Sequence, residues 1–142
     1  MDRNDLVLAA MAAGGENAAF PPAQAQKLFF LIDQEIAEHV GGKKFNFEPY
    51  DYGPFDSQVY RCLEGLGENG LVLISKGPPH RRYNLTKRGY EAGQRVFGTL
   101  PPEVQEFLKD SAKWVNSLQF EQLVSAIYQR YPAMKARSIF RV

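Results

Sequence analysis

The segment that decides the fold is FNFEPYDYGPFDSQVYRCLEGLGENGLVLISKGPPHRRYNLTKRG, residues 45–89. Its first part is aromatic and interrupted by prolines, so it predicts extended chain but no central strand. A short amphipathic helix follows over residues 56–69. A strand, a basic turn and a returning strand with Tyr83 and Leu85 on one face then lead to Thr86, a typical N-cap of another helix. This order of elements predicts a winged helix, a fold that serves mainly as a binding scaffold.

Local signals define the ends of the helix over residues 56–69. Asp56 or Ser57 is expected to cap its N-terminus, and Gly70 or Asn69 is expected to end it. Its apolar positions follow helical spacing and share one face: Val59, Cys62, Leu63 and Leu66. The opposite face is polar, so the sequence predicts a helix that packs on a core with one side only.

The flanking segments predict further helices. A short helix over residues 5–13 is stopped by two glycines, and residues 16–22 are expected to form a loop. A longer helix over residues 23–40 is predicted by apolar residues three and four positions apart. These are Ala25, Leu28, Phe29, Ile32, Ile36 and Val40.

The sequence GTLPP at residues 98–102 is the clearest internal boundary. Two more helices are expected after it, one over residues 103–116 and one that is capped by Ser117 and ended by Pro132. The sequence therefore predicts an α+β, mainly helical chain. It consists of a winged helix-turn-helix domain over residues 1–97 and a C-terminal helical extension over residues 98–142 that packs on it.

Composition limits the classes of function. The chain has 142 residues and a formal net charge of +1, which is less basic than a dedicated nucleic-acid binder usually is. If the protein binds DNA, its positive charge must be gathered on one face. One cysteine and two histidines distant in sequence predict no disulfide, no zinc site and no other cofactor, and fit a reducing cytoplasm. The apolar runs are too short to cross a membrane.

The segment YDYGPFDSQVYRCLEGLGENGLV resembles a prokaryotic group of small winged-helix proteins that includes phage-associated proteins and the Panacea domain of antitoxins. The upstream KLFFLIDQEI is similar to a helix of that group, and GLVLISKGPPHRRYNLTKRGYEAG resembles the wing of PadR- and MarR-like regulators. The resemblance covers residues 24–97. It implies a winged-helix adaptor, regulator or antitoxin, and no more specific function.

A winged helix that binds DNA places its second helix in the major groove and its wing on phosphates. In that pose Gln58 and Arg61 are expected to read base edges. The phosphate contacts are expected from Lys76, Arg81, Arg82, Lys87 and Arg88. Glu64 and Glu68 on the same helix oppose this pose, and a solvated basic surface is the alternative explanation of the cations.

Aromatic residues before the second helix and in the predicted extension are candidates either for a partner interface or for packing on the core. The interface candidates are Tyr50, Tyr52 and Phe55 before the second helix and Trp114 in the predicted extension. Phe45 and Phe47 belong to the same aromatic cluster before the second helix. Exposed aromatic side chains often anchor protein interfaces, whereas the alternative is that they fix the loop and the extension to the core. A partner such as a toxin, or a second copy of the chain in a homodimer, fits the first interpretation. The rival to DNA binding is thus a protein-interaction module that contacts no DNA.

The sequence offers no set of catalytic residues. Cys62 lies on an apolar helix face and is expected to fill the core. His80 stands in a proline-rich turn with no nucleophile nearby, and no glycine loop for phosphate is present. The protein is therefore predicted not to be an enzyme.

Overall fold

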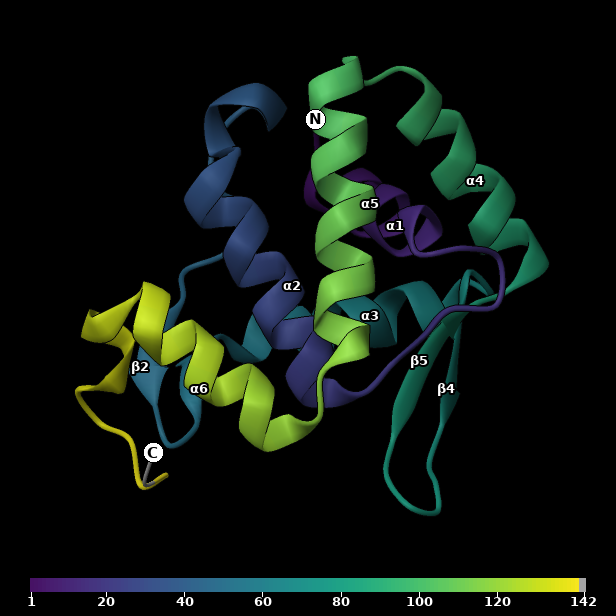
Figure 1. The fold of residues 1–142 in the computed structure, drawn as a ribbon. Coiled ribbons are helices and arrows are strands. Elements are labelled where there is room, and N and C mark those ends of the chain that lie inside the picture. Colours follow the sequence, from purple (N-terminus) through teal and green to yellow (C-terminus); the bar gives the residue numbers. More distant parts are fainter. Residues whose placement is uncertain (141–142) are drawn as a thin grey trace.

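The computed structural model describes residues 1–140, so the last two residues of the predicted extension lie outside the described part. The fold is α+β and about 60% helical, which confirms the predicted class. The described residues contain six α-helices (Figure 1): α1 Arg3–Ala13, α2 Pro22–Glu35, α3 Ser57–Glu68, α4 Lys87–Gly98, α5 Pro102–Ser117 and α6 Phe120–Arg130. Two 3-10 turns, Ala37–Val40 and Pro132–Lys135, follow α2 and α6.

In the described part of the chain, five short strands form two antiparallel sheets. They are β1 Ala19–Phe20, β2 Glu48–Tyr50, β3 Gly53–Phe55, β4 Val72–Ser75 and β5 Arg82–Leu85. The larger sheet has the strand order β1–β5–β4, and β2 and β3 form a separate hairpin. The β4–β5 hairpin projects away from the helices, whereas α6 lies beside the β2–β3 hairpin on the other side of the molecule (Figure 1).

Several of the predicted local features are confirmed. The Asp56 carboxylate accepts a hydrogen bond from the Gln58 amide at 2.9 Å and caps α3. The Thr86 hydroxyl accepts one from the Gly89 amide at 3.0 Å and caps α4. Tyr83 and Leu85 are both buried on one face of β5. These features depend on neighbours in sequence, which is why the sequence predicts them.

Three of the predicted elements are different in the structure. Residues 16–22 are not all loop, because β1 pairs with β5 and sets Phe20 opposite Tyr83. The helix predicted over residues 23–40 stops at Glu35, since Ile36 adopts a φ of −133° and a 3-10 turn follows. Ser117 caps nothing: it is the last residue of α5.

The N-cap of α6 is Gln119, whose backbone amide donates to the Gln122 side chain at 3.1 Å. The Ser117 hydroxyl donates to the Trp114 carbonyl within α5 at 2.7 Å. A hydrogen bond to the preceding turn satisfies the hydroxyl locally, so it does not serve as a cap.

The core lies between the helices and one face of the larger sheet. α5 packs against α1 and α2, and α6 packs against α2 and β3. Ten consecutive residues of α2, from Gln24 to Asp33, are buried, so this helix runs through the middle of the molecule. Within residues 1–140, no helix combines the length and the apolar character needed to cross a membrane. The division into a domain and an extension at residue 98 stays a prediction.

α4 approaches α1 closely at Gly93. A Cβ atom at this position would lie 2.4 Å from the Leu8 carbonyl oxygen and 2.9 Å from the Ala12 Cβ. Both distances are below van der Waals contact, and the nearer atom belongs to the backbone of α1. A side chain at this position therefore requires the two helices to move apart.

We expect Gly93→Ala to lower the free energy of unfolding by about 1–3 kcal/mol, because overpacking at a helix contact forces backbone shifts. Urea denaturation measures the change. Gly98→Ala is the matched control at the end of the same helix, where a Cβ atom meets nothing within 4 Å. The control is expected to be neutral or slightly stabilising. Equal stabilities of the two variants would contradict the close contact of α1 and α4.

Candidate functional site

The residues predicted to contact DNA lie on three neighbouring elements. Arg61 is exposed on α3, and Lys76 is exposed at the tip of the β4–β5 hairpin. Lys87 and Arg88 are exposed in the first turn of α4. Gln58 is half-buried in the first turn of α3. The structure thus leaves the predicted cations on α3, the hairpin tip and α4 accessible to solvent.

The two adjacent arginines of the hairpin lie on opposite faces. Arg82 pairs with Ser75 and alternates with the buried Tyr83, so it lies on the face of the sheet away from the core. Arg81 lies on the α3 side. The pKa of Arg81 is raised by its hydrogen bond to Tyr83, with a smaller contribution from the Glu64 carboxylate of α3. The structure therefore brings Arg81, but not Arg82, to α3.

Arg88 also lies beside α3. A Cβ atom on Gly70, just after this helix, would lie 3.1 Å from the Arg88 Nη1 atom. Arg61 precedes Glu64 by three positions and shares its side of the helix. Arg61 and Arg81 thus lie near Glu64, and their charges offset part of the repulsion that Glu64 would exert on a phosphate, whereas Arg88 lies beside the end of α3.

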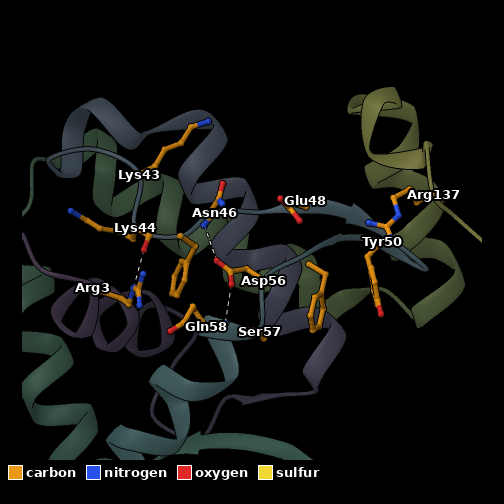
Figure 2. Close-up of a pocket in the computed structure, with 12 residues that line it drawn as sticks. Arg3, Lys43, Lys44, Asn46, Glu48, Tyr50, Asp56, Ser57, Gln58 and Arg137 are labelled. Carbon is orange, nitrogen blue, oxygen red and sulfur yellow. Dashed lines mark hydrogen bonds between the residues drawn. The ribbon is translucent and has the colours of Figure 1, made fainter.

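A polar cleft of about 610 Å³ lies at the N-terminal end of α3 (Figure 2). Figure 2 shows Arg3 and Lys44 at one end of the cleft, Arg137 beside Tyr50 at the other end, and Asp56 between them. The four cations that line it are Arg3, Lys43, Lys44 and Arg137. Its acidic lining residues are Glu48 and Asp56.

The charge of Asp56 is largely compensated inside the protein. Its carboxylate accepts hydrogen bonds from the Asn46 amide at 2.7 Å and the Gln58 amide at 2.9 Å, and it faces the positive end of α3. The contacts found for Arg3 and Arg137 in the cleft are to a carbonyl oxygen and to aromatic rings rather than to carboxylates. The Arg3 side chain donates to the Lys44 carbonyl at 2.9 Å and lies over the Phe45 ring, and Arg137 lies over the Tyr50 ring. The cleft as a whole therefore favours an anion.

The sequence predicts only part of this cleft. Gln58, Tyr50 and Phe55 are among the predicted site residues, whereas Arg3 and Arg137 come from the two ends of the chain. No local pattern links residues so far apart, so only the folded chain could reveal their proximity.

The aromatic residues before α3 divide between core and surface. Phe45 and Phe47 pack against Phe29 and Phe30 of α2, which matches the alternative explanation that they fix the segment to the core. Tyr50 and Tyr52 are 45% and 42% exposed, and the Phe55 ring stacks on Tyr50 at a centroid distance of 5.3 Å. The predicted interface tyrosines are thus accessible.

Trp114 lies at a different place. It is 37% exposed and lines a cavity of about 290 Å³ between α5 and α6, together with Leu31 and Ile127. Glu35 and Arg130, which form an ion pair at 3.0 Å, also line this cavity. The structure does not bring Trp114 into one surface cavity with Tyr50 and Tyr52, so the four predicted interface residues fall into two groups.

Buried polar side chains of α2 hold the segment before α3, and sequence reasoning missed them. Gln26 donates to the Asp56 carbonyl at 2.9 Å and accepts from the Asp56 amide at 3.0 Å. The Asp33 carboxylate accepts from the amides of Lys44 and Phe45 at 2.8 and 2.9 Å. Burial raises the pKa of Asp33, although these two amides act in the opposite direction.

Lys27 is the most unusual of these side chains. It is only 4% exposed, and its ammonium group donates to the Pro54 carbonyl at 3.3 Å. Burial lowers the pKa of Lys27 to about 8. Apolar residues lie all around α2, which is a signal for a fully buried helix and hence for a buried lysine.

The expected position of Cys62 needs a correction. It is half-buried rather than in the core, and its thiol donates to the Asn4 side chain at 3.2 Å, because it lies at the edge of the contact between α3 and α1. Burial raises the pKa of this thiol. Within residues 1–140, no group of three or more His, Cys, Asp or Glu side chains is arranged to hold a metal ion.

Comparisons of the chain with protein-family models, with curated proteins and with solved structures find no match. The residues and their geometry are therefore what supports a function. They offer two accessible features beside α3. One is the hairpin side, with the exposed cations Arg61, Lys76, Lys87 and Arg88, and the other is the cleft at the N-terminal end of α3.

The buried charge of Lys27 predicts a pH dependence of stability. Between about pH 7 and pH 9.5 the folded protein releases this proton, whereas the unfolded chain, with a lysine pKa near 10.5, retains it. The unfolding free energy of the wild type should therefore rise relative to that of Lys27→Met by about 2 kcal/mol over this range. Urea denaturation at several pH values measures the difference. A difference independent of pH would show that the folded protein does not bury a charged Lys27.

Proposed function

We propose that this chain is a winged-helix protein that binds DNA through α3 and the β4–β5 hairpin. The observation that carries the proposal is the order α1, β1, α2, α3, β4, β5 together with the strand order β1–β5–β4. Three helices beside an antiparallel sheet that ends in a projecting hairpin is the arrangement expected of a winged helix. The chain departs from that arrangement between α2 and α3, where residues 36–56 replace the usual short turn.

The charge distribution around α3 supports a DNA contact. Arg61 lies on the exposed side of this helix, and Gln58 lies near its N-terminus, where winged-helix and helix-turn-helix proteins contact base edges. Lys76 at the hairpin tip and Arg88 beside the end of α3 are suited to phosphates. The anion-favouring cleft extends positive charge to the N-terminal end of the same helix.

The biological role that we propose follows from the resemblance of residues 24–97 to the Panacea-related winged-helix group. It is a regulatory or antitoxin-like role without catalysis. The residue pattern around Gly53-Pro54 and the hairpin sequence support this assignment.

A protein-interaction module is the second candidate. The exposed Tyr50 and Tyr52 favour it, since such side chains are enriched in protein interfaces. Glu64 and Glu68 on α3 and the net charge of +1 point in the same direction. The partner in this case is a protein such as a toxin, or a second copy of the chain that contacts Trp114.

Binding of random duplex DNA, measured by fluorescence anisotropy from low to physiological salt, tests the first candidate. We expect affinity in the micromolar range that falls with salt, with a log–log slope of about −0.9 for each phosphate contacted. Lys76→Ala combined with Arg88→Ala should flatten the slope by about 2, because two phosphate contacts are lost.

The matched control is Lys109→Ala combined with Lys113→Ala, which removes two exposed cations from α5. It changes the net charge equally and should leave the slope unchanged. If both double variants lost the same part of the salt slope, net charge alone would explain the effect, and a contact of DNA with the hairpin side would be contradicted. No binding at low salt would refute the DNA proposal and favour the protein partner.

A further inference from the structure

A second cavity lies on the other side of the Tyr50–Phe55 ring pair. It has a volume of about 340 Å³, within the range of small-molecule sites in proteins. The first two turns of α2, the β2–β3 hairpin, α3 and the start of α6 surround it. Its lining is mainly apolar and aromatic: Pro22, Ala23, Tyr50, Tyr52, Phe55, Tyr60 and Phe120.

Lys27 lines this cavity and supplies its positive charge. The ammonium group has three donors, and Pro54 O is the one acceptor found for it among the described residues. Lys27 takes part in no ion pair within residues 1–140. A buried cation normally has a partner of opposite charge, because desolvation of an unpaired charge is costly. The ammonium group thus has donors beyond the one that Pro54 accepts, and it lies next to Gly53, which also lines the cavity.

The N-terminus of α2 reinforces the preference for an anion. The helix begins at Pro22, beside the cavity, and Pro21 provides no side-chain cap for its free amides. The positive end of the helix dipole therefore adds to the charge of Lys27. Two independent features of α2 therefore favour negative charge in this cavity.

We propose that this cavity binds a small organic acid, with its carboxylate on the Lys27 ammonium group and its apolar body among the rings of Tyr52, Phe55 and Phe120. The aromatic lining and the single cation fit a carboxylate with an apolar body better than a phosphate, which usually needs several polar donors. Asp51 also lines the cavity and disfavours a second negative charge, so the ligand is a monocarboxylate.

Binding of the acid is coupled to the protonation of Lys27. The carboxylate stabilises the charged ammonium group, so the acid binds the protonated protein, and its affinity falls as pH rises through the Lys27 pKa of about 8. The other titratable side chains around Lys27 are Tyr50, Asp51, Tyr52, Tyr60 and, from α6, Tyr128. Burial raises the pKa of Tyr60 to about 12, so this residue stays neutral over the same range.

Isothermal titration calorimetry with phenylacetate, and with the neutral phenylacetamide as its matched control, tests the proposal on the full chain. The acid should bind about ten- to a hundredfold more tightly than the amide, as expected for a charge-assisted hydrogen bond. Its affinity should fall roughly tenfold or more between pH 7.5 and 9.5. Lys27→Met should abolish the pH dependence and strongly reduce the preference for the acid, because it removes the ammonium group and leaves the other titratable groups in place.

Asp51→Asn provides a second variant that does not alter the buried lysine. It should strengthen binding of the acid and leave that of the amide unchanged, because only the acid is repelled by the Asp51 charge. Absence of saturable binding by the wild type, equal affinity for acid and amide, or unchanged acid binding by Lys27→Met would each overturn the proposal. These results do not depend on whether the protein binds DNA.

The same chemistry occurs in a free acid and at the C-terminus of a peptide that ends in an apolar residue. N-acetylphenylalanine mimics the peptide terminus and is titrated in parallel. Tighter binding of N-acetylphenylalanine than of phenylacetate would identify the source as a peptide, and the reverse order would identify it as a free acid. Either order supports a carboxylate site at Lys27.

Discussion

The paired hydrogen bonds between the Gln26 side chain and the backbone of Asp56, at 2.9 and 3.0 Å, determine where α3 begins. They join the middle of the molecule to the residue that caps α3. Lys27 and Asp33 hold the chain before that cap at Pro54 and at residues 44 and 45. Buried polar groups that are hydrogen-bonded specify one arrangement, because any other leaves them unpaired at high cost. The buried polar side chains of α2 therefore fix the position of residues 43–56.

The cation-rich cleft and the Lys27 cavity are both consequences of this arrangement. The segment held by α2 forms the β2–β3 hairpin, and its stacked Tyr50 and Phe55 rings line the cation-rich cleft on one side and the Lys27 cavity on the other. The C-terminal residues close the same region, since the Ile139 amide donates to the Asp51 carbonyl at 3.0 Å and Phe140 lies against Tyr52. A shift of the ring pair would thus alter both cavities at once.

The sequence predicts what depends on neighbouring residues and misses what depends on distant ones. The caps at Asp56 and Thr86 and the buried face of β5 follow from local patterns, and they are confirmed. β1 has only two residues and exists because β5 lies beside it, so no local signal predicts it. The same limit explains why the sequence does not link Arg3 and Arg137 with Lys44, and why it does not show that the Lys27 ammonium group meets the Pro54 carbonyl.

The charges on α3 illustrate why a count of charged residues is a poor guide to a binding surface. From the sequence, Glu64 and Glu68 oppose a DNA contact, and Arg81 and Arg82 support it equally. In the folded chain Arg81 lies near Glu64, whereas Arg82 lies on the other face of the hairpin. The acidic residues are in the C-terminal half of α3, and the cleft cations surround its N-terminal end. If α3 binds DNA as proposed, its N-terminal half must therefore face the duplex, because that half carries Gln58 and Arg61 and lies beside the cleft cations, whereas Glu64 and Glu68 lie in the other half.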